Sequence, residues 1–500
     1  MSLKKLTNIQ LTDDIINICR IIYTSGIKSH IVGGFIRDNL LGIKTSDIDI
    51  TVNNNAKDIG ILLAKKTSGK CITLDKKREI YRIITGSHYS PIQIDIAKSP
   101  EEIEDDLKAR DFTINSMAIN ISDLIKASQS TVEVKNIIDP HNGIADLEAN
   151  LLRATSQYSL SEDPVRLIRA IRISSQLDLE ITSDLNQSIS NQANLIKTTA
   201  KERIRAEFLN ILKQKNSSKW LKTMDSLSLL SEIIPEIELT KDVIQPKEHY
   251  WDVFGHLIES VNSIEKIFDY CLYSQSMDTA IDNEILSMVP VYQSMHSHFN
   301  SIAGDGHTRI VTSKLACLLH DIAKPLTKTI DANDRIRFLG HAEKGADISE
   351  SILRNLKCSN SLTEIVSTQV QYHLRPGQIS PKSQMPSNKA INKYFRDLGT
   401  VSIDTLYLHM ADYMAATGPL LKKSEWETNC LIINNLLKDG LNGTTPDKIP
   451  NLISGQDIMD KLNLNPGPLI GNILAMVRDA QEDGIIKSKE DALKYIEKFV

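Results

Sequence analysis

Two aspartates on one short alternating segment are the first residues in this sequence whose type and spacing suit a chemical task. Asp47 and Asp49 belong to the run SDIDITV at residues 46–52. Because the side chains of a strand alternate between its two faces, both carboxylates project from one face and the intervening apolar residues point into a core. Two adjacent carboxylates repel each other unless a divalent cation lies between them, and ligation by oxygen alone suits Mg²⁺ shared with substrate phosphates. The pattern therefore predicts a magnesium site for phosphoryl transfer, against the alternative of charges that protect an exposed strand edge.

A glycine pair precedes these acids in the sequence. Gly33 and Gly34 follow an apolar run and lead into a short helical pattern that carries Arg37. Paired glycines let backbone N–H groups come close to a triphosphate, and the amino terminus of a helix favours an anion. Arg37, one turn into the helix, is placed to hold phosphate oxygens. A glycine pair before a helix is usually only a tight turn, so its meaning depends on the acids that follow.

These residues need a scaffold of strands and helices to hold them in place. Residues 29–52 are typical of strand, turn, helix and strand, and further strand-like runs cover residues 70–74, 79–85 and 91–97. After Leu151 the strand signals fade, and apolar residues recur at helical spacing. The expected fold class is therefore α+β, a small α/β head followed by helical domains.

The glycine pair, Arg37 and the two aspartates in this order resemble the active-site signature of the polymerase-β-like nucleotidyltransferase superfamily. The resemblance implies that Asp47 and Asp49 hold metal ions that activate a 3′-hydroxyl and neutralise the departing pyrophosphate. Asp95 lies on a later alternating run. It either supplies a third acid from a neighbouring strand or faces solvent, and the sequence leaves both interpretations open.

A downstream motif narrows the family. Arg110 and Asp111 begin the run RDFTINSMA, which resembles the motif RRDFTINAMA of the tRNA CCA-adding enzymes and poly(A) polymerases. In that family the arginine and the aspartate hold the incoming nucleotide, so the same role is implied for Arg110 and Asp111. Ala109 stands where many relatives have a first arginine, so any contact of that arginine is missing here.

A second motif, EDPVRLIRAIR, occupies residues 162–172 and is typical of the start of a helix. It resembles the EDxxR nucleotide-selecting motif of the bacterial and eukaryotic class of CCA-adding enzymes and their poly(A) polymerase relatives. The resemblance implies that Asp163 and Arg166 recognise the base, with Arg169 and Arg172 as further nucleotide-binding residues. Without the upstream motifs, three arginines at this spacing would indicate only a solvated basic face.

Histidines and aspartates are spread over the helical second half of the chain. Their order, H…HD…H…H closed by an aspartate, resembles the HD phosphohydrolase superfamily, in which imidazoles and carboxylates surround one or two metal ions. The implied ligands of the first metal are His256, His320, Asp321 and Asp412, with His341 and His373 as accessory residues nearby. Mg²⁺ or a divalent transition metal is expected at this site.

The motifs and the breaks in pattern divide the chain into four expected domains. A linker-like stretch around Pro246 and the pair Gly418-Pro419 mark two of the boundaries. The expected domains are a polymerase-β-like head at residues 1–150, a helical neck that selects the nucleotide and binds RNA at 151–240, an HD domain at 241–415 and a helical tail at 416–500. No chemistry can be assigned to the tail.

Basic residues gather in the expected neck. They offer contacts to a tRNA backbone, because phosphate contacts need positive charge without base specificity, although such runs often only face solvent. The residues are Lys197, Lys201, Arg203, Arg205, Lys213, Lys215, Lys219 and Lys222.

Composition places the chain among folded globular proteins. Of its 500 residues 41% are apolar and 24% charged, and the formal net charge of −5 argues against a general basic coat. Its six cysteines form no CxxC pair, which favours a reducing compartment. The amino terminus lacks the apolar core of a signal peptide, and no stretch reaches the apolar length of a membrane span. A cytoplasmic protein without membrane contact is expected.

The leading interpretation is a template-independent enzyme that adds nucleotides from CTP and ATP to the 3′ ends of tRNA. Poly(A) addition uses the same motifs. A partial CC- or A-adding enzyme is a third alternative, because residues 96–109, between Asp95 and Arg110, are fewer than in many CCA-adding relatives. The most remote alternative is a phosphoesterase in which the HD half does the chemistry and the head only binds nucleotides. The sequence names no protein partner.

Overall fold

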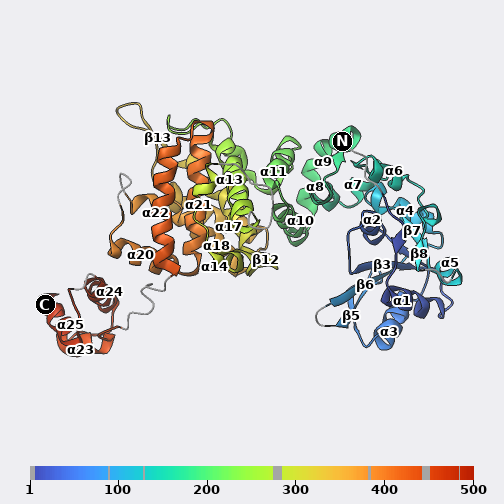
Figure 1. Cartoon of the computed structure of the whole chain (residues 1–500), viewed down its shortest axis with the longest axis horizontal. Coiled ribbons are helices and arrows are strands. Elements are labelled where there is room, and N and C mark those ends of the chain that lie inside the picture. The colour runs from blue at the N-terminus through green and yellow to red at the C-terminus, as the bar shows by residue number, and fades with distance from the viewer. Residues whose placement is uncertain are drawn as a thin grey trace. The chain divides into compact units, whose positions relative to one another are not determined.

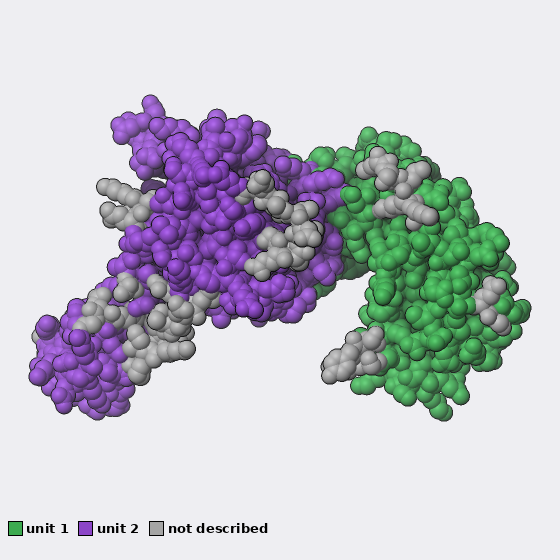
Figure 2. Space-filling view, in the orientation of Figure 1, with its two compact units in different colours: residues 1–207, 223–233 green, residues 208–222, 234–500 purple. Residues whose placement is uncertain are grey.

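The structure is a computed structural model of the chain, and its contacts divide it into two compact units, coloured separately in Figure 2. One unit comprises Met1–Glu207 with Thr223–Ile233, and the other Phe208–Lys222 with Ile234–Val500. The structure describes residues 6–87, 90–127, 130–273, 284–380, 385–441, 451–482 and 485–499. The finer domain boundaries expected near residues 150, 240 and 415 stay predictions.

A six-stranded mixed sheet forms the centre of the first unit (Figure 1). Its strands, in spatial order, are β4 (Lys70–Asp75), β5 (Ile80–Ser87), β6 (Ser90–Lys98), β3 (Asp47–Val52), β2 (Ser29–Val32) and β7 (Ala118–Asn120). The β3–β6 pair is parallel, and the other neighbours are antiparallel. The strands expected from the sequence are therefore confirmed.

Helix α3 (Ala56–Lys66) covers one face of this sheet over β4, β5 and β6. Gly60 lets the helix come close, because a Cβ at this position would lie 3.1 Å from the Sγ atom of Cys71. The covered face holds apolar side chains such as Ile83 and Ile94, which are fully buried. The opposite face carries the acids of β3.

Further short elements complete the first unit. Its other helices are α1 (Asp13–Tyr23), α2 (Gly34–Leu40), α4 (Ile103–Lys108), α5 (Ile121–Lys126), α6 (Gly143–Glu148), α7 (Ser159–Glu162), α8 (Val165–Leu177), α9 (Ser183–Gln192) and α12 (Leu229–Ile233). Its minor strands are β1 (Ile9–Gln10), β8 (Thr131–Val132), β9 (Leu151–Leu152) and β10 (Glu180–Ile181). Two of the unit boundaries fall inside α10 (Lys201–Lys213) and α11 (Ser217–Ser226), and the third follows α12.

The second unit is built around helix α15 (Arg309–Leu319), in which every residue from Val311 onward is buried. A helix that is buried on all sides forms the centre of a bundle. Helices α13, α18 and α21 pack directly on α15, and α17 packs on α18. Their bounds are α13 (Val253–Tyr273), α17 (His341–Asn355), α18 (Asn360–Tyr372) and α21 (Ser402–Thr417).

Further helices surround this bundle. The helices are α14 (Gln293–Asn300), α16 (Lys324–Thr327), α19 (Arg375–Gln378), α20 (Asn388–Leu398) and α22 (Lys423–Leu441). The last of them, α22, is tied to the preceding part of the chain, since the Trp426 indole donates to the Ile285 carbonyl over 2.8 Å. Among the described residues, no helix has the length and apolar character that crossing a membrane requires.

The second half, which was expected to be helical, also contains two short antiparallel ribbons. They pair β11 (Ile302–Gly304) with β12 (His307–Thr308), and β13 (Lys328–Ile330) with β14 (Ile336–Phe338). In the turn of the second ribbon, the Asp331 carboxylate accepts hydrogen bonds from the backbone N–H groups of Asn333 and Arg335. Two or three alternating residues are too few for a strand signal in the sequence.

The end of the chain has a small core of its own. It consists of α23 (Gly455–Leu462), α24 (Pro468–Glu482) and α25 (Lys489–Ile496), which bury Ile458, Ile473 and Ile496 together. Ser454 and Ser488 each begin a helix in a reciprocal capping box with an aspartate three residues later.

Candidate functional site

The two aspartates lie side by side on β3. Asp47 and Asp49 are both exposed, while Ile48 and Ile50 on the opposite face are almost fully buried. The parallel register places Asp95 of β6 beside Asp49. Desolvation by the surrounding atoms, with the charges of Asp95 and Asp47, raises the pKa of Asp49 above its usual value, although Arg110 opposes the shift. Desolvation and the neighbouring carboxylates both disfavour the charged form of Asp49, and a cation at the same point would offset both effects.

A pocket of about 440 Å³ opens beside these acids. All residues of the head and neck that the sequence proposed as catalytic or nucleotide-binding line it, except Asp163 and Arg166. The lining members are Gly33, Gly34, Arg37, Asp47, Asp49, Arg110, Asp111, Arg169 and Arg172. A wall that combines glycine backbone, four arginines and two free carboxylates suits a triphosphate with its metal ions.

Gly33 is required by its conformation and by its surroundings. Its φ angle is +75°, in the left-handed region that favours glycine. A Cβ at this position would lie 2.7 Å from Nη1 of Arg110 and 3.4 Å from Oδ2 of Asp49. The backbone before α2 therefore faces Asp49 and Arg110 directly.

Asn115, which the sequence analysis did not single out, orders two proposed ligands of the nucleotide. Its Oδ1 accepts a hydrogen bond from Arg37 over 2.7 Å, and its Nδ2 donates to Asp111 over 2.9 Å. Burial alone would raise the pKa of Asp111, but the Arg169 guanidinium at 3.1 Å and the bond from Asn115 lower it below its usual value. Its place inside the RDFTIN motif was a signal that could have identified Asn115.

Glu207 is a second residue that the sequence analysis missed. Its carboxylate accepts from Nε of Arg169 over 2.9 Å and from Nε of Arg172. Glu207 comes from α10, and nothing in its local sequence distinguishes it from other helical glutamates. Only the packing of α10 near α8 reveals that it fixes the two arginines.

Asp163 and Arg166 do not reach the pocket wall. Asp163 forms a two-point ion pair with Arg203, with distances of 2.9 and 2.7 Å. Arg166 donates to the carbonyls of Ser159 and Ala109, both over 2.9 Å. The residues expected to read the base are thus held by protein partners in this structure. Arg203, expected to contact tRNA, is the partner of Asp163.

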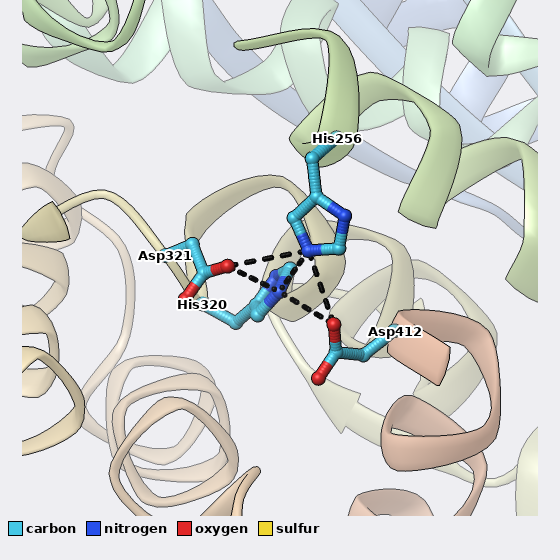
Figure 3. Close-up of side chains that lie close together, drawn as sticks. All are labelled: His256, His320, Asp321 and Asp412. Carbon is cyan, nitrogen blue, oxygen red and sulfur yellow. Dashed lines mark hydrogen bonds and ion pairs between the residues drawn. The ribbon is translucent and has the colours of Figure 1, made fainter. Parts of the chain in front are cut away.

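The second cluster lies in the helical unit, where four ligand-type side chains converge (Figure 3). Nε2 of His256 lies 3.1 Å from Nε2 of His320, 3.2 Å from Oδ2 of Asp321 and 3.0 Å from Oδ1 of Asp412. His256 comes from α13, His320 and Asp321 follow α15, and Asp412 comes from α21. The bundle therefore brings together the whole ligand set that the sequence proposed for the first metal.

The two accessory histidines face the other oxygen of the same aspartate. Nε2 of His341 lies 3.2 Å from Oδ1 of Asp321, and Nε2 of His373 lies 3.7 Å from it. Among the described residues, these three atoms are buried without a hydrogen-bond partner. Asp321 is consequently placed to bridge two cation sites, one on each carboxylate oxygen.

Three of these histidines are oriented in the same way. The Nδ1 atoms of His320, His341 and His373 lie 2.9, 2.6 and 2.6 Å from the backbone carbonyl three residues earlier in the chain. A proton on Nδ1 satisfies that carbonyl and leaves the lone pair of Nε2 directed at the cluster. This is the tautomer that a metal-binding imidazole needs.

The charges of the cluster favour a cation. Burial would lower the pKa of His320, but Asp321 and Asp412 raise it to about 10. Lys324 contacts Oδ2 of Asp321 over 2.5 Å. An adjoining pocket of about 580 Å³ is lined by Asp321, Asp412, Lys324, Arg335, Arg337 and Arg375 among others, so an anionic substrate has access to the cluster.

Comparison with protein families gives three matches along the chain. Residues 29–153 match the Poly A polymerase head domain, residues 178–240 the probable RNA and SrmB-binding site of polymerase A, and residues 295–417 the HD domain. His256 lies before residues 295–417, and only the fold brings it to the other ligand-type side chains of that domain. A nucleotidyltransferase head and an HD domain both imply the use of divalent metal ions.

Relatives that match nearly the whole chain include enzymes with different names. An A-adding tRNA nucleotidyltransferase from Deinococcus radiodurans is 26% identical over 94% of this chain and 95% of its own. A CC-adding tRNA nucleotidyltransferase from Thermus thermophilus is 25% identical over 93% and 92%. A CC-adding enzyme from Synechocystis is 28% identical over 94% and 93%.

Solved structures share the fold. A Thermotoga maritima CCA-adding enzyme complexed with tRNA has a TM-score of 0.56 and 18% identity, covering 100% of this chain and 99% of that one. An apo CCA-adding enzyme has a TM-score of 0.60 and 19% identity, covering 98% and 95%. Both likenesses extend over the α/β head and the helical remainder.

Proposed function

Because the chain belongs to the tRNA nucleotidyltransferase and poly(A) polymerase family, we propose that it transfers nucleotides from CTP and ATP to the 3′ end of tRNA and releases pyrophosphate. The observation that carries the proposal is the pair Asp47 and Asp49, exposed on β3 and opening into a pocket that also holds Gly33, Arg37 and Arg110. The six cysteines, all free thiols, support a cytoplasmic location.

The side chains of the pocket have separable roles. Asp47 and Asp49 would hold Mg²⁺, which when bound lowers the cost of charge on the attacking and leaving oxygens. Arg37 and Arg110 bind the triphosphate, and the backbone at Gly33 comes close to it because no side chain intervenes. Asp111, fixed by Asn115 and Arg169, orients the nucleotide. Catalysis then consists mainly of positioning and charge stabilisation, as in other phosphoryl transfers.

Asp163 and Arg166 account for the choice of base without a template. A carboxylate accepts a hydrogen bond from an exocyclic amine, and a guanidinium donates to an unprotonated ring nitrogen. Cytosine presents that pair at N4 and N3, and adenine at N6 and N1, whereas uracil and guanine present the reverse. Because Asp163 is paired with Arg203 here, reading the base requires that this ion pair opens or that Asp163 uses a remaining lone pair.

A direct assay tests the activity and its extent. A tRNA without its terminal CCA is incubated with each labelled nucleoside triphosphate separately and then with CTP and ATP together, and the product ends are sequenced. Addition of CTP- and ATP-derived nucleotides, and exclusion of UTP and GTP, is the expected result. A protein that extends no RNA under any of these conditions would refute the proposal.

Partial addition is a second candidate, favoured by the relatives that span nearly the whole chain. Four of them are named A-adding or CC-adding enzymes. The same sequencing distinguishes products ending in CCA, in CC or in a single added A. Runs of adenosine would instead indicate poly(A) polymerase activity.

A metal-dependent phosphoesterase activity of the helical unit is a further candidate, supported by the buried carboxylate of Asp321 between two sets of imidazoles. His256, His320 and Asp412 would hold one divalent ion, and His341 and His373 a second, with Asp321 shared. The ions, Mg²⁺ or a transition metal, would activate water and stabilise a phosphoryl group. Lys324 and Arg375 line the access pocket and provide positive charge for the phosphate.

The phosphoesterase is tested with protein stripped of metal and reloaded with Mg²⁺, Mn²⁺, Ni²⁺ or Co²⁺ in turn. Hydrolysis of p-nitrophenyl phosphate or of its diester by the reloaded wild type, and not by a His320→Ala variant, is expected. Absence of hydrolysis with every ion would remove this activity and leave nucleotide addition untouched.

A further inference from the structure

The outer face of the sheet continues beyond the two aspartates onto β6, β5 and β4. Residues directly opposite in neighbouring strands share a face, and the register gives one row across four strands: Asp49, Asp95, Arg82 and Ile72. Ile72 and Ile84 are 45% and 41% exposed on this face. The helix that packs on these three strands, α3, lies on the other side, where its Gly60 faces Cys71, Tyr81 and Ile83. The row is therefore open to a partner.

Arg82 is fixed in this row and keeps donors free. Its Nε and Nη2 donate to the two oxygens of Asp95 over 2.8 and 2.7 Å, and its side chain is 32% exposed. Nη1 has no hydrogen-bond partner among the described residues. Because both oxygens of Asp95 accept hydrogen bonds from Arg82, Asp95 holds this guanidinium in place beside Asp49.

The in-line geometry of the displacement indicates which substrate lies over this row of residues. In an in-line displacement, the attacking hydroxyl and the leaving pyrophosphate lie on opposite sides of the reacting phosphorus. The glycines and Arg37, which suit the triphosphate, follow β2 on one side of β3. The attacking 3′ end must then approach over β6 and β5, on the other side.

The charges on this face also favour the approach of RNA over β6 and β5. Asp47 and Asp49 repel the phosphates of an RNA strand, and Arg82, with the exposed Lys70 opposite Ile84, supplies the compensating positive charge. Because the guanidinium of Arg82 contacts Asp95, it lies about one strand spacing, about 5 Å, from the position of Asp49, which is comparable with the span of one nucleotide.

We propose that Arg82, held by Asp95, binds the last phosphodiester of the acceptor RNA, and that Ile72 and Ile84 form an apolar ledge under its terminal nucleotides. The proposal rests on the proposed nucleotide addition and names a subsite of that same head. It makes Arg82 a residue for the RNA substrate, distinct from the arginines that hold the incoming nucleotide.

The test combines a variant with a modified substrate. Extension kinetics are measured for the wild type and for Arg82→Ala combined with Asp95→Asn, which removes the guanidinium without leaving an unpaired carboxylate beside Asp49. Each protein receives RNA with a normal or an uncharged methylphosphonate linkage at the last position. Since a charge-assisted hydrogen bond contributes about 1.5–3 kcal/mol, KM for RNA should rise about tenfold to a hundredfold in the variant, with KM for CTP and ATP unchanged.

The modified linkage gives the decisive comparison. In the wild type, the methylphosphonate should raise KM for RNA by a factor similar to that of the substitutions. In the double variant it should raise KM for RNA little further, because the contact is already lost. Arg78→Ala is the matched control, since this arginine lies in the turn of the same β4–β5 hairpin with its side chain 71% exposed, and it should behave as the wild type.

Three outcomes would overturn the proposal. If the wild type treats both linkages alike, or if the double variant raises KM for the nucleotide instead of KM for RNA, Arg82 does not bind the terminal phosphate. If the wild type extends neither RNA, the proposed function fails together with this inference. The first two results leave the proposed function intact, so the failures are distinguishable.

Discussion

The two candidate metal sites of this protein differ in the exposure and in the type of their ligands. In the head, two carboxylates stand exposed on one strand, and arginines aimed at a substrate surround them. In the helical unit, four imidazoles and one aspartate are at least nine-tenths buried: His256 and His341 lie in α13 and α17, the adjacent His320 and Asp321 follow α15, and His373 follows α18. The first site offers few ligands and leaves room for substrate oxygens. The second presents ligands for metal ions without any help from a substrate.

This difference has a physical reason. Mg²⁺ keeps several waters and is usually bound by one or two carboxylates together with substrate phosphates, so an open pair of aspartates is sufficient. Buried imidazoles lose their freedom on folding and are oriented by their second nitrogen, which favours a resident ion. We therefore expect the head to acquire its ions with the nucleotide and the helical unit to keep them through purification.

The largest effect is expected from substitutions that inactivate the head alone. Asp47→Ala or Asp49→Ala should lower the rate of nucleotide addition by about a thousandfold or more, because each removes an anionic ligand worth several kcal/mol in the transition state. Both side chains are exposed, so the fold and the metal content of the helical unit should not change. Radiolabel incorporation measures the rate. Addition near the wild-type rate in both variants would mean that these acids are not the active site.

The second prediction concerns substitutions that remove metal binding from the helical unit and leave nucleotide addition by the head intact. The pair His320→Ala and Asp321→Ala removes ligands from both halves of the cluster, so metal retained after dialysis should fall to background, as measured by elemental analysis. Nucleotide addition should remain within about twofold of the wild type, because the two clusters have no residue in common and belong to separate compact units. Equal loss of both properties in a folded protein would argue against separate sites.

A smaller effect sharpens the contrast within the head. Gly33→Ala puts a Cβ 2.7 Å from Nη1 of Arg110 at a φ of +75°, whereas the nearest atom to a Cβ on Gly34 lies at 3.5 Å. Strain and displacement of Arg110 of about 1–3 kcal/mol should weaken nucleotide binding about tenfold to a hundredfold in Gly33→Ala. Gly34→Ala is the matched control, and its KM for CTP should stay close to that of the wild type. Equal KM values in both variants would show that the backbone does not approach the triphosphate here.

The smallest effect concerns selectivity. Asp163→Ala should reduce discrimination against UTP about tenfold while slowing chemistry less, because a mismatched buried hydrogen bond costs about 1–3 kcal/mol and the phosphate-binding arginines remain. The ratio of kcat/KM for CTP and UTP measures it. Arg203→Ala frees Asp163 without removing it and should keep the discrimination. Undiminished rejection of UTP by Asp163→Ala would exclude this residue from base reading.

Local patterns predicted much of the head. Strict alternation in SDIDITV placed Asp47 and Asp49 on one face, and the structure has both exposed there. The glycine pair predicted a tight turn from a strand into a helix, and Gly33 forms that turn with a positive φ angle that favours glycine. These features depend on neighbours in sequence, so the sequence contains them directly.

Other contacts had no local signal. Glu207 joins Arg169 and Arg172 from a helix more than thirty residues away. Asp163 was expected to face the base, but its partner in the structure is Arg203, which the sequence marked only as part of a basic run. The pairing of charges is decided by which helix faces match, and helical spacing alone does not show this.

The sequence by itself therefore determined the order of the motifs, the strand that presents the acids, the position of the glycine turn and the residue types able to bind metal. Only the tertiary structure decided that Asp321 faces two sets of histidines with its two oxygens, and that Asp95 is occupied by Arg82 beside Asp49. The reason is that periodicity specifies the face of an element, whereas the partner across that face depends on the packing of segments far apart in the chain.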